Sequence, residues 1–294
     1  MEAVASAAEP VVRSPDILGE SPLWDWRTER LFWVDVRAPA LRSLDPSSGR
    51  TRSWPMPEIV SAVMLRAAGG LVVGLRSGLH TFNPDTAALE MLHPIDEPQH
   101  EGNRVNDCKV DRSGALWWST MWDFGLHTTG SLYRLHPDGT NETIRTDITV
   151  PNGLCFDPGG ERGHFADTAT GRLETFRIRA DGSVGDWREL GGSLDLPGRP
   201  DGSACDARGY VWNARYGGGA VACIAPSGEL AARIDLPTSQ PSCCAFGGSD
   251  LRTLFVTTSR QKLSDVALAR EPMAGALLRV PVEHAGQREP AFAG

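Results

Sequence analysis

The chain lacks several features that would place it in a membrane, secreted or nucleic-acid-binding class. None of its apolar stretches approaches the ~18 residues that span a bilayer. The segment Met1 to Pro10 lacks the basic and apolar regions of a secretory signal. With a formal net charge of −8 and no basic run, nothing in the chain would neutralise a phosphate backbone. These absences predict a cytoplasmic protein that binds neither membranes nor nucleic acid.

Common motifs of nucleophilic and zinc catalysis are also missing. There is no Gly-x-Ser-x-Gly, no HExxH, and no GxGxxG that opens a helix. The six cysteines form no CxxC pair, and the seven histidines show no ligand spacing. Four cysteines lie just after the repeat positions described below, and we expect them to be small buried hydrophobes: Cys108, Cys155, Cys205 and Cys243.

Helical periodicity is almost absent, and only Leu263 to Arg270 predicts a short helix. In its place, six small or oxygen-bearing residues each stand just before a β-rich block: Glu20, Ser61, Asn106, Asn152, Asp201 and Ser242. The steps between them are 41, 45, 46, 49 and 41 residues. A unit that recurs at about 40 to 50 residues is typical of a β-propeller.

The predicted fold is therefore all-β: a six-bladed β-propeller with four-stranded antiparallel blades. We expect one domain over residues 1–294, with blades that start near 20, 61, 106, 152, 201 and 242. The segment 10–17 precedes the first blade and is expected to close the ring as the outermost strand of the last one.

Four of the six repeat positions carry carboxylate or amide oxygens: Glu20, Asn106, Asn152 and Asp201. In a propeller the first strands line a central channel, so these side chains would meet at one mouth and form a site for a hard cation. Asn-Gly and Asp-Gly are also ordinary turn dipeptides, which is the alternative interpretation. Their shared phase in successive repeats favours the cation site.

The motifs around these positions resemble those of the senescence-marker-protein/gluconolactonase/regucalcin family of six-bladed propellers. They are Gly19-Glu20-Ser21-Pro22, Arg104-Val105-Asn106-Asp107, Pro151-Asn152-Gly153 and Pro200-Asp201-Gly202. The resemblance covers residues ~15 to 285 and implies one divalent cation, held here by Glu20, Asn152 and Asp201. It also implies hydrolysis of a small-molecule sugar lactone, such as a glucono-, arabinono- or xylonolactone.

The resemblance further implies that Arg104, Asn106 and Asp107 bind substrate hydroxyls. Alternatives stay open: Arg104 as a salt bridge at the channel mouth, Asn106 as a fourth metal ligand through water, and Asp107 in a turn or supporting role. Mechanistically, we expect the cation to polarise the lactone carbonyl and Asp201 to accept a proton from the attacking water.

Departures from the family pattern leave the substrate open. Ser21 and Cys108 replace common glycines, and the tract Trp122 to His127, expected over the site, is not acidic as in the animal proteins. The alternatives are a propeller acting on another ester, lactone or phosphotriester, as in paraoxonase and diisopropyl fluorophosphatase, and a non-catalytic calcium-binding propeller. For the first, Trp24, Trp122, Phe124 and Tyr216 would supply an apolar pocket. The particular lactone, the oligomeric state and the native ion among Ca²⁺, Mg²⁺, Mn²⁺, Zn²⁺ and Fe²⁺ do not follow from the sequence.

Overall fold

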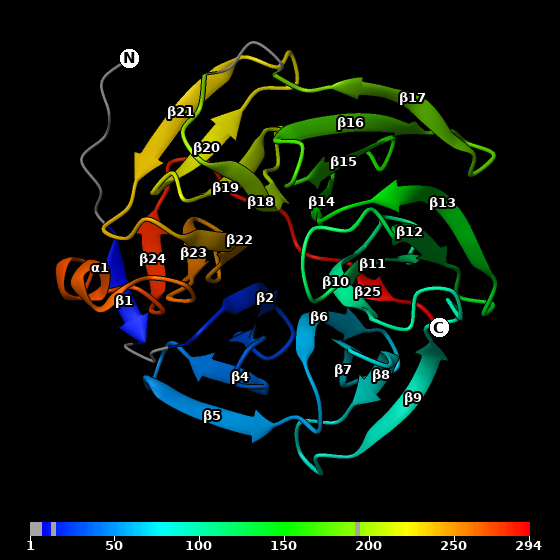
Figure 1. The fold of residues 1–294 in the computed structure, drawn as a ribbon, viewed down its shortest axis with the longest axis horizontal. Coiled ribbons are helices and arrows are strands. Elements are labelled where there is room, and N and C mark those ends of the chain that lie inside the picture. The colour runs from blue at the N-terminus through cyan, green and yellow to red at the C-terminus, as the bar shows by residue number, and fades with distance from the viewer. Residues whose placement is uncertain (1–7, 13–15, 192–194) are drawn as a thin grey trace.

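The computed structural model describes residues 8–12, 16–191 and 195–294, and it confirms the six-bladed propeller (Figure 1). The innermost strand of each blade is the first of its repeat. These strands are β2 (Gly19–Asp25), β6 (Val60–Arg66), β10 (Asn103–Val110), β14 (Pro151–Phe156), β18 (Arg199–Cys205) and β22 (Pro241–Gly247). Each contacts the innermost strand on either side, so together they form a closed ring around the axis.

The other strands follow outward in antiparallel order. The second strands are β3 (Arg30–Asp35), β7 (Leu71–Leu75), β11 (Leu116–Trp122), β15 (Arg162–Asp167), β19 (Val211–Tyr216) and β23 (Thr253–Thr258). The third strands are β4 (Ala40–Asp45), β8 (Gly78–Phe82), β12 (Gly130–Leu135), β16 (Arg172–Ile178), β20 (Ala220–Ile224) and β24 (Leu277–Pro281). The outer strands are β5 (Arg50–Pro55), β9 (Leu89–Pro94), β13 (Asn141–Ile148), β17 (Val184–Glu189) and β21 (Leu230–Asp235), with β1 (Glu9–Val12) completing blade 6.

Strand β1 pairs antiparallel with β24, so the N-terminal segment supplies the outer edge of the last blade. Residues 13–15 of the predicted closing segment, and 1–7 before it, lie outside the described residues. The short helix expected near 263–270 is present as α1 (Asp265–Arg270), which has no buried residue. Within the described residues, no helix is long and apolar enough to cross a membrane.

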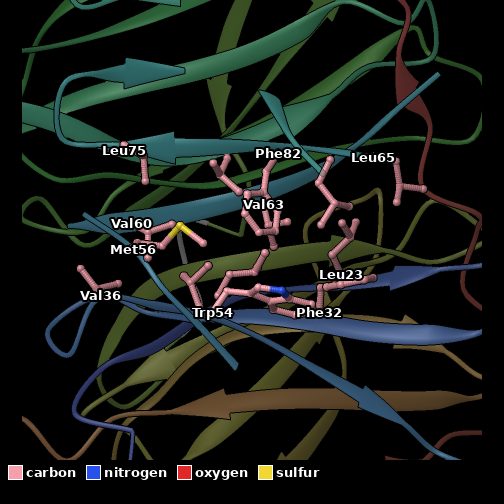
Figure 2. Close-up of a cluster of buried hydrophobic side chains, with 14 of the residues drawn as sticks. Leu23, Phe32, Val36, Trp54, Met56, Val60, Val63, Leu65, Leu75 and Phe82 are labelled. Carbon is pink, nitrogen blue, oxygen red and sulfur yellow. The ribbon is translucent and has the colours of Figure 1, made fainter. Parts of the chain in front are cut away.

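The core lies between neighbouring blades, because the sheet of each blade packs an apolar face against the sheet of the next blade. Between blades 1 and 2, Trp54 stacks on Phe32 at 6.4 Å and meets Phe82 edge-on at 5.9 Å (Figure 2). Such aromatic pairs add about 0.5–1.5 kcal/mol each beyond the area they bury. This packing gives the channel rigid walls.

The C-terminal segment crosses the ring from blade 6 to blade 2, which the repeat did not predict. In Figure 1 it is the red ribbon that runs across the centre to β25 (Ala291–Phe292). Along the way it bonds to residues of blades 5, 4, 3 and 1: Ala207, Phe156, Arg112 and Trp26. Strand β25 then pairs parallel with β6, which gives blade 2 a fifth strand on its channel side.

Candidate metal centre at one mouth of the channel

Five of the six predicted site residues line a single cavity of about 260 Å³ at the start of the innermost strands. They are Glu20, Arg104, Asn106, Asn152 and Asp201, and they come from blades 1, 3, 4 and 5. A volume near the lower end of the usual range of about 300–1,000 Å³ suits a small ligand. The sixth residue, Asp107, does not line this cavity.

Strand pairing is interrupted at the repeat position of every innermost strand. The breaks lie between Glu20 and Leu23, Val60 and Ala62, Val105 and Cys108, Asn152 and Cys155, Pro200 and Ser203, and Pro241 and Cys243. A β-bulge bends its strand and re-aims the side chains beside it. The same local irregularity, repeated six times, therefore presents the repeat residues to one mouth of the channel.

The residue after each expected ligand is constrained by the local structure, at two of the three positions through a left-handed backbone. Gly153 has a φ of 72°, in the left-handed region that glycine enters without strain. Ser21 takes a φ of 48° without being glycine, and its hydroxyl accepts the Val63 N–H at 3.0 Å. That bond to blade 2 helps to offset the cost of the left-handed conformation. At Gly202 the constraint is space, since an added Cβ would lie 2.2 Å from the Cys243 sulfur.

Similar hydrogen bonds tie neighbouring blades together at the level of the site, at four of the six junctions of the ring. In each, a side chain donates to the carbonyl of the residue that precedes the next blade's site residue. The pairs are Ser61 Oγ to Val105 O (2.8 Å), Asn106 Nδ2 to Pro151 O (2.7 Å), Thr168 Oγ1 to Pro200 O (2.7 Å) and Ser242 Oγ to Gly19 O (2.5 Å). The two serines among the repeat residues thus position their neighbours.

The three expected metal ligands present oxygens that the protein leaves largely unpaired. Asp201 Oδ1 is buried and has no hydrogen-bond partner within the part of the chain that the structure describes. In that part, Glu20 Oε2 accepts only the N–H of the adjacent Ser21, at 3.1 Å. Asn152 donates from Nδ2 to Thr168 at 2.8 Å, and its Oδ1 accepts from Asn106 Nδ2 at 3.0 Å. An orphaned carboxylate oxygen beside a second carboxylate and an amide oxygen fits a hard divalent cation.

The electrostatics of the cavity favour the same ion. Burial raises the pKa of Glu20 to about 8, with Asp107 adding to the shift and the Ser21 N–H and Arg104 opposing it. Burial, followed by the charges of Glu20 and Asp107, raises the pKa of Asp201 well above its ordinary value. Carboxyl groups that are buried close together and have raised pKa values are typical of a site that a cation completes. Within the described residues, no three His, Cys, Asp or Glu side chains form a metal-binding group, so an amide has to complete the set.

Arg104 is buried and held at three points. Its Nε donates to Asp123 Oδ1 at 2.6 Å, and Nη1 donates to Val105 O and to Asn106 Oδ1. The salt bridge considered as its alternative role is therefore present, and Arg37 shares the same Asp123 carboxylate at 3.0 Å. Nη2 has no partner among the described residues, so two N–H donors remain for a ligand.

Asp107 lies further along the channel. It lines a separate space of about 20 Å³ together with Lys109 and Glu289 of the C-terminal segment. Its Oδ2 accepts the Leu154 N–H at 2.8 Å, and burial raises its pKa to about 6. The structure thus places Asp107 in a different space from Arg104 and Asn106, although the three residues share one sequence motif. Its position suits the supporting role that was given above as an alternative.

Several residues of the cavity lie outside the repeat positions because they follow the second strand of a blade. Four of them were missed by the sequence analysis: Arg37, Thr168, Gln261 and Lys262. Asp123 has the same kind of position but belongs to the tract 122–127 expected over the site, and Tyr216, weighed for an apolar pocket, ends a second strand. All of these residues lie at or just after the end of a second strand, and this shared position in the repeat could have identified them from the sequence. Gly125 and Leu126, from the tract 122–127, also line the cavity, so this tract lies at its mouth.

Other candidate features lie apart from this cavity. Of the four aromatic residues weighed for an apolar pocket, only Tyr216 is among its lining residues. Trp24 instead stacks on Phe255 between blades 1 and 6. A larger hollow of about 560 Å³ between blades 1 and 2 contains none of the predicted site residues. All six cysteines are free and buried, as expected for the four that follow repeat positions.

Comparisons with known proteins show the family to which this fold belongs. The model of the SMP-30/gluconolactonase/LRE-like region matches residues 18–260. The chain belongs to this family. The resemblance drawn from the four sequence motifs is therefore confirmed.

Relatives of this chain in the family include lactonases of several sugars. The 6-deoxy-6-sulfogluconolactonase of Pseudomonas putida is 36% identical over 288 residues, covering 97% of this chain and 98% of that protein. The L-arabinolactonase of Azospirillum brasilense is 34% identical and covers 99% and 97%. The solved structure of regucalcin from Agrobacterium tumefaciens, a calcium-binding protein, superposes with a TM-score of 0.93 at 31% identity and covers 99% of each chain.

Proposed function

We propose that this chain hydrolyses a sugar lactone to the corresponding aldonic acid at a divalent-cation site formed by Glu20, Asn152 and Asp201. The observation that carries the proposal is the buried, unpaired Asp201 Oδ1 in a cavity that also holds Glu20 and the free donors of Arg104. Supporting it, related chains that align over nearly their full length are named as lactonases.

Bound to these ligands, a divalent cation would supply Lewis-acid polarisation of the lactone carbonyl. The protein groups divide the remaining work. Asp201 accepts a proton from the water that attacks the carbonyl carbon, through the carboxylate oxygen that the cation would leave free. As the ring C–O bond breaks, the same carboxyl returns that proton to the departing oxygen.

Arg104 orients the substrate, and Asn106, whose Nδ2 already bonds to Pro151 O and Asn152 Oδ1, holds the guanidinium in place through its Oδ1. The Nη2 donors of Arg104 are available for sugar hydroxyls, because Nε and Nη1 are fixed by Asp123, Val105 and Asn106. A guanidinium fixed in this way loses little rotational freedom when it binds a hydroxyl. In this proposal Asp107 lies further along the channel and supports the site through its negative charge, which acts on Glu20 and Asp201.

The test is a pH-stat assay across pentono- and hexonolactones, with the chelated protein and single divalent ions added back. We expect hydrolysis that a chelator removes and an ion restores. Asp201→Ala should lower kcat/KM at least about a hundredfold, as expected when a general base and metal ligand are removed together. Asp235→Ala, on the outer strand of the same blade, is the matched control and should be unaffected. Full activity of the Asp201 variant would refute the proposal.

A calcium-binding protein without catalysis is the second candidate, favoured by the similarity to a calcium-binding regucalcin. The oxygens of Glu20, Asn152 and Asp201 would bind calcium equally well in a protein without catalytic activity. Saturable calcium binding with no turnover of any lactone would select it.

A further inference from the structure

With every carboxylate ionised, the charged side chains that line the cavity balance. Three are acidic, Glu20, Asp123 and Asp201, and three are basic, Arg37, Arg104 and Lys262. A bound divalent cation would add two positive charges, of which Asp107 in the neighbouring space offsets only one, so positive charge remains in excess at a site that is partly open to solvent. A neutral sugar lactone would do nothing to reduce that excess.

Arg37 has donors to spare at the mouth of this cavity. Its side chain is 31% exposed, and Nη1 and Nη2 each bond once to Asp123, at 3.1 and 3.0 Å. Of the five guanidinium N–H groups, three remain without a partner among the described residues. Since Arg104 shares the same carboxylate, the pair of arginines keeps one uncompensated positive charge.

Lys262 is the second free cation at the mouth. It is exposed, has no partner among the described residues and takes a φ of 60°, a left-handed conformation that is strained for lysine. The neighbouring backbone imposes this conformation, because the Gln261 N–H bonds to Ile17 O and to Ser259 Oγ. The chain has only one other lysine, the buried Lys109.

Arg37 and Lys262 lie on two loops that hydrogen-bond to the same short stretch, Ile17 and Leu18. The loop of Arg37 is held by the Val36 N–H on Leu18 O, and that of Lys262 by the Gln261 N–H on Ile17 O. This stretch leads directly into Glu20, so both cations line the same part of the cavity wall as a metal ligand.

We propose that Arg37 and Lys262 bind an acidic substituent of the substrate, so that the preferred substrate is an anionic sugar lactone. This deepens the proposed function and depends on it for turnover. The substituent is a carboxylate or a sulfonate on the carbon furthest from the lactone carbonyl, because the carbonyl itself must face the cation. An anion there offsets the excess positive charge of the loaded site, and the fork of Arg37 suits either acid group.

The test compares matched lactones that differ only in that substituent, with the calcium-loaded protein. D-glucaro-1,4-lactone is paired with D-glucono-1,4-lactone, and 6-deoxy-6-sulfo-D-glucono-1,5-lactone with D-glucono-1,5-lactone. We expect kcat/KM to favour the anionic member of at least one pair by about tenfold or more, and the two pairs distinguish carboxylate from sulfonate. Equal or greater kcat/KM for both neutral members would overturn the proposal.

Arg37→Gln and Lys262→Asn remove one charge each, and asparagine tolerates the left-handed conformation at 262. Each should lower the anionic-to-neutral selectivity ratio about threefold to tenfold, as expected for a partly exposed charge pair. Arg252→Gln is the control, since it removes an exposed cation in the β22–β23 turn at the opposite end of the innermost strands. An unchanged ratio in both cavity variants refutes the assignment of these residues.

Calorimetry separates this proposal from the lactonase proposal. D-glucarate, with two carboxylates, should bind the calcium-loaded protein about tenfold more tightly than D-gluconate, and Arg37→Gln should remove the difference. Tighter glucarate binding without turnover of any lactone would leave the anion site standing and refute the lactonase. Equal binding of the two acids would refute the anion site.

Discussion

Glu20 and Asp201 show how a single residue can serve function at the expense of stability. Both carboxyl groups are buried in one cavity, and burial raises the pKa of each. At neutral pH the metal-free protein must either protonate them or hold their charges close together. Residues of this kind lower the stability of the fold in return for a strong cation site.

Asp201→Asn should therefore separate stability from activity. The amide keeps the shape of the side chain but removes its charge, so near pH 8 the chelated variant should be more stable than the wild type by about 1 kcal/mol or more. Lactone hydrolysis should be lost at the same time. Urea denaturation of both proteins in chelator measures the first effect. A less stable variant would mean that protein partners already stabilise the Asp201 charge.

The directions of neighbouring side chains cannot be derived from the sequence motif. The Arg-x-Asn-Asp motif groups Asn106 with Asp107, yet the structure puts Asn106 in the main cavity and Asp107 in the smaller space beyond it. Adjacent residues of a strand point to opposite sides, and the bulge between Val105 and Cys108 shifts that alternation locally. A motif records which residues occur, whereas the bulge that sets their direction has no distinct sequence signal.

At the scale of elements, the repeat predicted most of the ring. The innermost strands begin at residues 19, 60, 103, 151, 199 and 241, within three residues of the repeat positions. The positions of these strands can be predicted locally, because short aromatic and β-branched runs form the strands and Asp–Gly turns separate them. Strand β25 carries no such signal, because two residues that pair with a strand more than 200 positions earlier show no periodicity.

The C-terminal segment has an energetic role that its sequence does not suggest. Lys109 Nζ lies 2.9 Å from Glu289 Oε1, with only 13% and 15% of the two side chains exposed. Burial alone would lower the pKa of Lys109, but the groups around it, Glu289 first and Asp107 among the others, together raise that pKa above its ordinary value. This ion pair joins the segment to the channel wall just beyond Asp107.

Glu289→Ala should destabilise the protein by about 3 kcal/mol, because it leaves the Lys109 cation buried without its main partner. Urea denaturation measures the loss. Glu283→Ala, an exposed carboxylate in the same segment, is the control and should change stability by no more than about 0.5 kcal/mol. The double variant Lys109→Met/Glu289→Leu should recover much of the loss. Equal stability of Glu289→Ala and the wild type would show that the crossing segment is held by its backbone contacts alone.

At the scale of the whole molecule, the site connects blades that are far apart in the chain. Glu20, Asn152 and Asp201 come from blades 1, 4 and 5, and the ring is completed by strand β1 from the opposite end of the sequence. A cation that binds all three residues can do so only in the closed ring. Its binding free energy therefore adds to the unfolding free energy of the entire propeller.

This coupling predicts a pH dependence with a definite sign. The pKa of Glu20 is about 8 in the folded protein against 4.5 ordinarily, so the metal-free fold holds a proton that the unfolded chain releases between these values. The stability from that proton is fully present below pH 4.5 and is lost as the pH rises through 8. A cation must displace the proton, so its own stabilisation changes in the opposite direction and grows as the pH rises.

Thermal unfolding in chelator and in calcium, at about pH 5.5 and about pH 8, measures both effects, since each pH unit in this window changes the competition by up to about 1.4 kcal/mol. We expect the calcium-dependent rise in melting temperature to be clearly larger at the higher pH. Glu20→Gln should weaken calcium binding and flatten its pH dependence, because the amide has no proton to displace. A calcium effect of equal size at both pH values would mean that these carboxyl groups are already ionised without the cation, and the electrostatic case for the site would fail.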